Sequence, residues 1–378
     1  MAAEPGILFT IASFALVIGL LVFIHEIGHY LAGRAFGVKA DVFSIGFGTE
    51  LFGWTDRQGT HWKVSLLPLG GYVKFAGDMN PASQPSEAWL MLPPEERART
   101  FQGKTLFQRS IIVLAGPVTN FLFAILIFAG FFAFYGHPRT PPVVAFIAPN
   151  SAAAAADFRP GDRILRVDGS AIDRFEDIAR IVSIRPGQSL PIVIERPDGT
   201  RRTADVVIGT VEEVDRFGNH YRIGRLGISP GAQVIERISV GAVIVAATQH
   251  TFELTGTMVE TLGQVITGRR STQELGGPLK IAQFSGATAA AGFPVLIEFI
   301  AFISINLGFI NLLPVPMLDG GHLLFYGLEA VRRRPLQRKT QEWAFMSGLV
   351  LLMSLMLFVT LNDLASFGFW ASLAALIG

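Results

Sequence analysis

The residues best suited to chemistry are His25-Glu26-Ile27-Gly28-His29, an HExxH pattern. On a helix, positions four apart lie on one face, so both imidazoles can bind one zinc ion. Glu26, beside the first histidine, can take a proton from a zinc-activated water as that water attacks a peptide carbonyl. The same carboxylate can then pass the proton to the leaving amine. The spacing therefore predicts metal-assisted hydrolysis of a peptide bond.

A five-residue pattern also arises by chance, and its setting decides between the two interpretations. The motif directly continues residues 7–24, a run without a charged residue. A charged side chain at the centre of a membrane helix costs roughly 2.5–3.5 kcal/mol on insertion scales, so ionisable groups there mark functional sites. We therefore interpret His25, Glu26 and His29 as metal-binding and catalytic residues.

A catalytic zinc site needs a third protein ligand and one open position. The chain has no cysteine, and Ala32 and Ala35 stand where a metzincin motif requires Gly and His. The best remaining candidate is Asp319, which follows two prolines that break a helix and free backbone groups near the membrane. Asp319 could instead cap the helix that follows it. Its expected depth, close to the membrane face that His29 approaches, favours the ligand.

The composition is typical of a membrane protein. Only 16% of the residues are charged, against about 25% in soluble domains. A spanning helix needs about 20 mostly apolar residues. Four segments qualify: residues 7–24, 111–135, 293–313 and 343–361. The net charge of +1 gives no basic field for nucleic acid.

Basic residues in the short loops predict the orientation. Residues 332–339 form the strongest basic cluster, and the loop between the first two spans also ends with basic residues. With four spans these loops share one side, which we expect to be the cytoplasm. Both termini and the long 136–292 segment then face outward.

The regions between the spans differ in pattern. Residues 38–77 show short strands and glycine turns, with 61–66 as the clearest strand. Residues 143–229 alternate β-type runs with two helices, at 151–157 and 174–184, as in one small α+β domain. The expected strands are 143–148, 164–167, 190–195 and 203–208. Residues 238–267 have a helical pattern.

The pairing of HExxH at the end of a first span with Asn-x-x-Pro-x-Pro-x-x-Asp-Gly at the end of a later span resembles the site-2 protease family, M50. Within it, the chain is most similar to the bacterial RseP-type intramembrane proteases. Further matching stretches are residues 43–48, 68–74, 115–120 and 318–322. The resemblance covers nearly the whole chain. It implies one Zn²⁺ per chain, held by His25, His29 and Asp319, with Glu26 as the base.

The resemblance also implies how a substrate is held. It places Asn311 beside the scissile bond and makes 38–77 a membrane-re-entrant β-element that presents the substrate as an added strand, with Gly70, Gly71 and Tyr72 in contact. A helical substrate hides its peptide bonds, so such unwinding is physically necessary. Asn311 could instead satisfy carbonyls that the prolines free.

The outward domain resembles a PDZ domain, and the chain has room for only one. Leu226, Gly227 and Ile228 could form its carboxylate-binding loop, where backbone N–H groups hold a C-terminus. An ordinary glycine turn is the alternative interpretation.

The predicted fold is a mainly α-helical membrane protein with four transmembrane helices, a membrane-associated β-element and one α+β PDZ-like domain. The expected organisation is 1–36, first span with HExxH; 37–109, cytoplasmic-side region with the β-element; 110–136, second span; 137–230, periplasmic PDZ-like domain; 231–292, connecting helices; 293–331, third span with the Asn/Pro/Asp-Gly motif; and 332–378, basic loop and fourth span.

The leading hypothesis is a zinc endopeptidase of the bacterial inner membrane that cuts single-pass membrane proteins, such as anti-sigma factors already clipped outside, and also remnant signal peptides. The oligomeric state stays open. A non-catalytic adaptor is a second hypothesis, but an inactive relative should have lost Glu26 or a ligand. A metal transporter is a third, since polar groups in spans also mark ion pathways. Zinc stoichiometry and peptide cleavage would separate the three.

Overall fold

The computed structural model describes residues 5–77, 92–214, 220–267, 276–334 and 336–367. The chain divides into two compact units. The first comprises Met1–Phe128, Thr248–Met258 and Gln273–Gly378, and the second comprises Ala129–Ala247 and Val259–Thr272.

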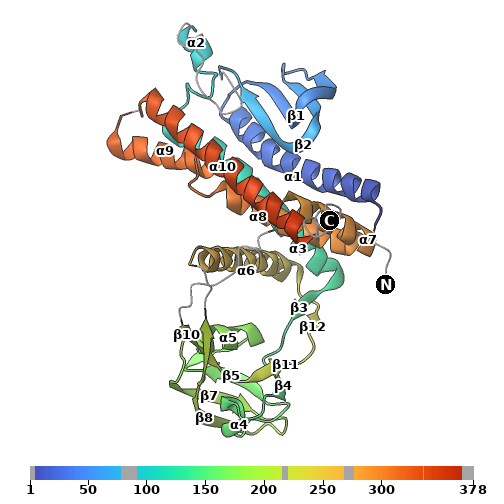
Figure 1. Cartoon of the computed structure of the whole chain (residues 1–378), viewed down its shortest axis with the longest axis vertical. Helices are drawn as coiled ribbons and strands as arrows, with labels where there is room; N and C mark the ends of the chain where they lie inside the picture. Colours follow the sequence, from blue (N-terminus) through green and yellow to red (C-terminus); the bar gives the residue numbers. More distant parts are fainter. Residues whose placement is uncertain (1–4, 78–91, 215–219, 268–275, 335, 368–378) are drawn as a thin grey trace, which may run out of the picture. The chain divides into compact units, whose positions relative to one another are not determined.

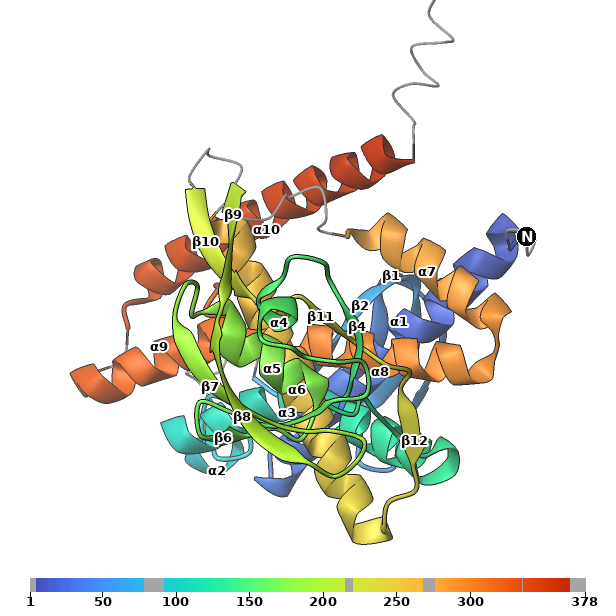
Figure 2. The same cartoon turned by 90° about the horizontal axis from the view of Figure 1, so that it is seen from below.

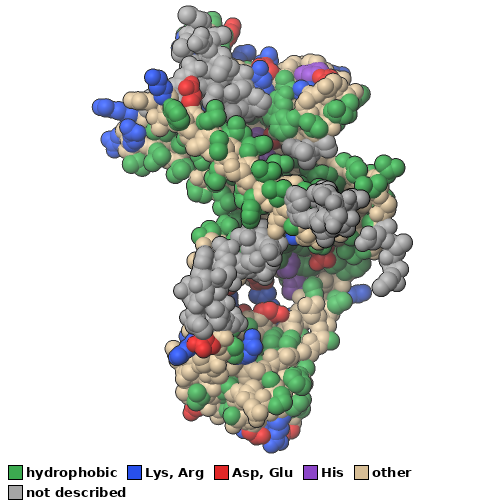
Figure 3. All heavy atoms as spheres, viewed as in Figure 1, with side chains coloured by type: hydrophobic (Ala, Val, Ile, Leu, Met, Phe, Trp, Pro, Cys, Tyr) green, Lys and Arg blue, Asp and Glu red, His purple; other side chains and the backbone are tan. Residues whose placement is uncertain are grey.

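Within the described residues, four helices are long and apolar enough to cross a membrane: α1 (Ile7–Ala35), α3 (Leu106–Tyr135), α8 (Phe293–Asn311) and α10 (Arg338–Ser366). Large apolar side chains stay exposed on them, as Leu8 and Phe134 do, because hydrocarbon replaces water around such helices. Hydrophobic side chains cover much of the visible surface of these helices in Figure 3. The prediction of four spans is confirmed. Helix α1 extends to Ala35 and therefore contains the whole HExxH motif.

A long antiparallel hairpin packs against α1 (Figure 1). Its strands are β1 (Ala40–Thr55) and β2 (His61–Phe75), so β2 is longer than the six residues expected. Stacked Phe43 and Trp62 rings, 4.3 Å apart, join the two strands and contact Tyr30 of α1. The part of the hairpin next to its turn exposes apolar side chains, including Leu51, Phe52, Trp54, Leu66 and Leu67. Such an apolar surface suits the predicted membrane association.

Asp56 closes the turn between these strands. Its carboxylate accepts hydrogen bonds from the backbone N–H groups of Gln58 and Thr60 and from Trp62 Nε1, at 2.8–2.9 Å. Slight burial opposes ionisation, but the hydrogen bonds outweigh it and hold the pKa of Asp56 below its ordinary value. Asp56 is therefore ionised at neutral pH, and its hydrogen bonds stabilise the turn that joins β1 to β2.

The described part of the first unit also contains α2 (Pro94–Arg97), α7 (Pro278–Ala291) and α9 (Asp319–Arg332), besides a middle portion of a helix that continues into the second unit. Helix α7 lies beside α1, as both views show (Figures 1 and 2). Its Gly286 sits where a Cβ would come within 2.5 Å of the Thr10 hydroxyl, so only glycine allows this approach. Buried Asp363 of α10 accepts hydrogen bonds from the N–H groups of Gly277 and Lys280 and so caps α7.

The second unit contains a four-stranded antiparallel sheet in the order β6-β5-β7-β8, formed by Ser170–Ala171, Arg163–Val167, Ser189–Glu195 and Arg201–Val207. Alternate residues such as Ile192, Ile194 and Val206 face the core. Helices α4 (Ala152–Ala155) and α5 (Phe175–Ser183) lie close to the two predicted positions, and Val144–Ile147 forms β4 as predicted.

Sequence patterns missed three pairings in this unit. Gly209–Val214 (β9) pairs with His220–Arg225 (β10), β4 pairs with Ile228–Pro230 (β11), and His137–Arg139 (β3) pairs with Val234–Glu236 (β12). Strands β3, β11 and β12 are each three residues long, too short for an alternation to be recognised. Helix α6 follows at Val240–Ile266.

Candidate metal centre and active site

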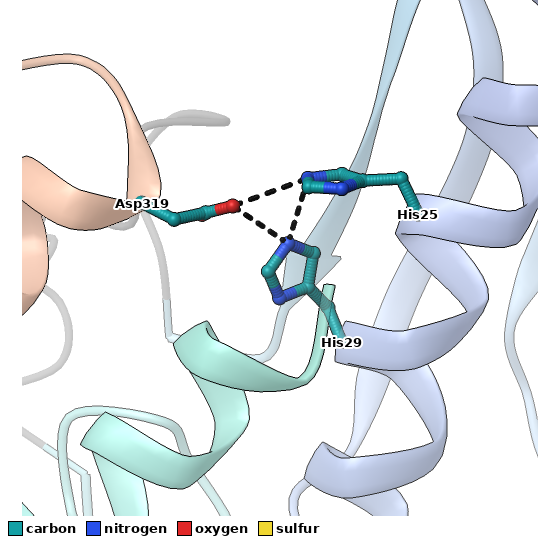
Figure 4. Close-up of side chains that lie close together, drawn as sticks. All are labelled: His25, His29 and Asp319. Carbon is teal, nitrogen blue, oxygen red and sulfur yellow. Dashed lines mark hydrogen bonds and ion pairs between the residues drawn. The ribbon is translucent and has the colours of Figure 1, made fainter. Parts of the chain in front are cut away.

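Three potential metal ligands converge between α1 and α9 (Figure 4). The Nε2 atoms of His25 and His29 lie 3.2 Å apart, one helical turn along α1. The Oδ2 atom of Asp319 lies 3.2 Å from the first and 3.5 Å from the second. Residues 290 positions apart in sequence thus aim three donor atoms at one point.

The donors fit a zinc ion. Metal–ligand bonds of about 2.0–2.2 Å in a tetrahedral site separate the ligand atoms by roughly 3.3–3.6 Å, close to the distances seen here. Asp319 Oδ2 is buried and lacks a hydrogen-bond partner among the described residues. Two imidazoles and one carboxylate are also a ligand set of known catalytic zinc sites.

The outer nitrogen of His29 is fixed by α3. Nδ1 lies 2.9 Å from the backbone carbonyl of Ile112. A carbonyl only accepts, so Nδ1 carries the proton and Nε2 keeps its lone pair toward the metal centre.

The outer nitrogen of His25 lies 3.2 Å from the side-chain amide of Asn120, which is fully buried. Asn120 Nδ2 faces the ring, and Oδ1 has no partner among the described residues. The two amide orientations are interchangeable by a 180° rotation, after which Oδ1 accepts the His25 Nδ1–H and leaves Nε2 free for a metal. Sequence reasoning gave Asn120 no role, although a polar residue inside an uncharged span was a signal.

Close packing of α1 on α3 needs glycine at two positions. A Cβ on Gly116 would overlap the His29 ring, and a Cβ on Gly28 would overlap Thr119 Oγ1 and the Ala115 carbonyl. Ile112, Gly116 and Asn120 are four residues apart, so one face of α3 meets the face of α1 that bears both histidines.

Asp319 is positioned by the proline loop that precedes it. Asp319 is not the N-cap of α9, because Leu318 holds that position and Asp319 is the first residue of the helix. The carbonyls of Leu312 and Leu313 pack where a Cβ on Gly320 would lie, and that of Val315 packs likewise on Gly321. The two glycines let the loop fold onto α9, which leaves the Asp319 carboxylate directed at the histidines.

Comparison with known proteins agrees with this geometry. Residues 13–355 match the profile described as Peptidase family M50. The chain belongs to peptidase family M50.

Relatives of this M50 chain match almost end to end. A protein of Agrobacterium fabrum that bears a provisional zinc metalloprotease name is 45% identical over 97% of this chain and 98% of its own length. Metalloprotease MmpA of Caulobacter vibrioides is 37% identical over 95% and 96%. M50 membership implies a zinc metalloprotease of the site-2 type that works within a membrane on membrane proteins.

The solved PDZ domain of the SdrC-like protein from Listeria monocytogenes is similar to 23% of this M50 chain, with 19% identity and a TM-score of 0.19. A score that low carries no argument. The PDZ-like interpretation of the second unit therefore depends on its own strands and helices.

In this M50 chain, Glu26 is buried on α1 and faces strand β2. The backbone N–H of Val73 hydrogen-bonds its carboxylate. A Cβ on Gly71 would lie 3.1 Å from Glu26 Cγ and 2.6 Å from the Ser44 carbonyl, so the strand approaches the carboxylate only because residue 71 is glycine.

The other residues predicted to bind substrate lie on two elements. Tyr72 stacks on Phe47 with ring centroids 6.0 Å apart, and Gly70 packs against the same Phe47 ring. Asn311 is the last residue of α8 and is half-buried.

The predicted carboxylate loop belongs to the second unit. Leu226 is buried in its core, and its carbonyl accepts a hydrogen bond from Ala153 N–H. Gly227 has a φ of 81°, and its carbonyl accepts from Ala148 N–H. Ile228 begins β11. These carbonyls serve the fold, and ligand binding by the loop stays a prediction.

Proposed function

We propose that this chain is an intramembrane zinc endopeptidase that cleaves single-span membrane proteins within or near their transmembrane segment. The observation that carries the proposal is the convergence of His25, His29 and Asp319 inside a bundle of apolar helices. Three ligands leave one tetrahedral position open, as catalysis requires.

Each residue then has a distinct task. A bound zinc ion supplies a Lewis acid that activates a water near neutral pH. Glu26 accepts the proton of the attacking water and later delivers it to the leaving amine. Ile112 and Asn120 keep the two imidazoles oriented, so that the metal ligands do not have to reorganise during the reaction.

The hairpin next to Glu26 suits strand addition. A transmembrane helix shields its peptide bonds, so the substrate must become extended before hydrolysis. Strand β2 lies against the catalytic carboxylate at Gly71, and in our proposal the substrate pairs near Gly70, Gly71 and Tyr72. Asn311 holds the peptide beside the scissile bond.

We further propose which substrates the enzyme cleaves and in which membrane it lies. The substrates are anti-sigma factors already clipped outside, and also remnant signal peptides. The enzyme lies in a bacterial inner membrane with the PDZ-like domain and both termini in the periplasm, the metal centre toward the cytoplasm, and one zinc ion per chain. Leu226, Gly227 and Ile228 bind the new C-terminus of a clipped substrate.

The test is co-expression with a tagged, pre-truncated single-span protein, comparing wild type with Glu26→Gln. General-base loss should reduce cleavage by about 10²- to 10⁴-fold while zinc content stays near one per chain. Undiminished cleavage by Glu26→Gln would refute the assigned base. No cleavage by zinc-loaded wild type of any single-span protein offered would favour the adaptor instead.

A further inference from the structure

A pocket of about 410 Å³ lies apart from the metal centre, between the start of α3 and the end of α9. Leu106, Arg109, Glu329, Ala330, Arg333 and Arg334 line it. Figure 3 shows Lys and Arg side chains gathered at this end of α9. The catalytic mechanism uses none of these residues.

Arg109 lines the pocket and contacts two neighbouring side chains. Its guanidinium lies 5.0 Å from the centre of the Tyr326 ring and 3.9 Å from Glu329 Oε2. Its Nε is buried and lacks a hydrogen-bond partner among the described residues. The Arg109 side chain as a whole keeps 19% of its surface exposed, so its guanidinium can still meet an acceptor that enters the pocket.

Glu329 does not neutralise the pocket. Its Oε1 already accepts hydrogen bonds from the Leu336 N–H at 3.0 Å and from Gln341 Nε2 at 3.4 Å, so the carboxylate serves the turn between α9 and α10. Three arginines and one carboxylate line the pocket, and the excess positive charge favours an anion.

The position of the pocket favours a lipid over a soluble anion. Arg109 is the last charged residue before the uncharged run 110–135 of α3, which places it where a spanning helix leaves the hydrocarbon. Leu106 lines the pocket, and the neighbouring Phe107 is 73% exposed. An acyl chain can contact these apolar groups while its phosphate meets the arginines.

We propose that this pocket binds the phosphodiester headgroup of an anionic phospholipid. Basic pockets between membrane helices at this depth bind such headgroups. A zwitterionic lipid has the same phosphate but adds a cation, which the arginines repel. The bound lipid joins the start of α3 to the end of α9, the two helices that orient His29 and carry Asp319.

The test is native mass spectrometry of the delipidated full chain, titrated with phosphatidylglycerol or phosphatidylcholine of equal acyl chains. Arg109→Gln and Arg334→Gln alter lining residues. Arg332→Gln removes the same charge two positions before Arg334, at a residue that does not line the pocket. It is therefore the matched control. We expect phosphatidylglycerol to bind more tightly and each lining substitution to weaken it about fivefold. Arg332→Gln should change it less than twofold.

Three results would overturn the proposal. Equal affinity for the two lipids would remove the charge argument. An equal loss in Arg332→Gln would mean a diffuse surface potential instead of a site. Full competition by soluble glycerol phosphate at the same concentration would make the ligand a soluble phosphate. Arg334 is exposed, so its variant stays informative even if Arg109→Gln folds poorly.

Discussion

The imidazoles of His25 and His29 owe their orientation to single atoms on α3. For His29 the partner is a backbone carbonyl, which no substitution of a side chain removes. For His25 it is the Asn120 side chain, so this half of the metal centre can be tested by mutation.

Asn120→Ala should lower zinc affinity about 10- to 100-fold, the usual cost of losing an outer partner of a metal-bound histidine. Chelator competition with purified protein would measure it. Asn306→Ala is the matched control, because Asn306 also lies in a span but its side chain donates to the Phe302 carbonyl of its own helix and not to a histidine. Asn120→Asp keeps an acceptor and should retain most of the affinity.

Wild-type zinc affinity in Asn120→Ala would show that the amide only packs against the ring. The Glu26→Gln prediction also concerns a single residue. It does not depend on the zinc affinity of Asn120→Ala, because Glu26→Gln should lose cleavage while keeping zinc.

At the scale of elements, the crossing of α1 and α3 decides whether the histidines have room. Gly116 faces the His29 ring at this crossing, and the Gly28 position of α1 meets the α3 backbone. A side chain at either position must push the helices apart or turn a ring away.

Gly116→Ala should therefore abolish stoichiometric zinc binding and substrate cleavage, because the added methyl takes the space of the His29 ring. Gly130→Ala is the control on the same helix, since a Cβ there meets nothing within 4 Å. Metal analysis and the co-expression assay would check both variants. Full zinc content in Gly116→Ala would mean that the helices separate at little cost.

At the scale of the molecule, the candidate active site belongs to the first unit. His25, Glu26, His29 and Asp319 all lie in Met1–Phe128 or Gln273–Gly378. Within the second unit, β3 and β12 form a paired ribbon, with His137 opposite Glu236. The ends of the segment between them are thus neighbours in space.

Replacing residues 137–236 by a short Gly/Ser linker should leave zinc content unchanged, because no ligand is removed and the cut ends already lie side by side. We further propose that the PDZ-like domain keeps substrates that have not been clipped away from the site. The deletion should then also let the enzyme cleave a single-span protein that has not been pre-truncated. Metal analysis and cleavage of paired long and short substrates would measure both effects. Loss of zinc would show that the second unit supports the metal centre.

The sequence predicted the spans and the HExxH chemistry because both depend on local spacing. Eighteen uncharged residues indicate a membrane helix, and a four-residue interval puts two histidines on one face of it. Asp319 was predicted by depth and resemblance, while its alternative as a helix cap stayed open until α9 was seen to begin with Leu318 as its N-cap.

Tertiary structure alone decided what surrounds the ligands. The carbonyl of Ile112, the amide of Asn120 and the space at Gly116 matter only because α3 crosses α1 at these residues, and no local pattern encodes a crossing point. The length of β2 and the approach of Gly71 to Glu26 likewise depend on partners distant in sequence. Local spacing identified the candidate residues of the HExxH motif, and long-range packing determined how they and Asp319 are arranged.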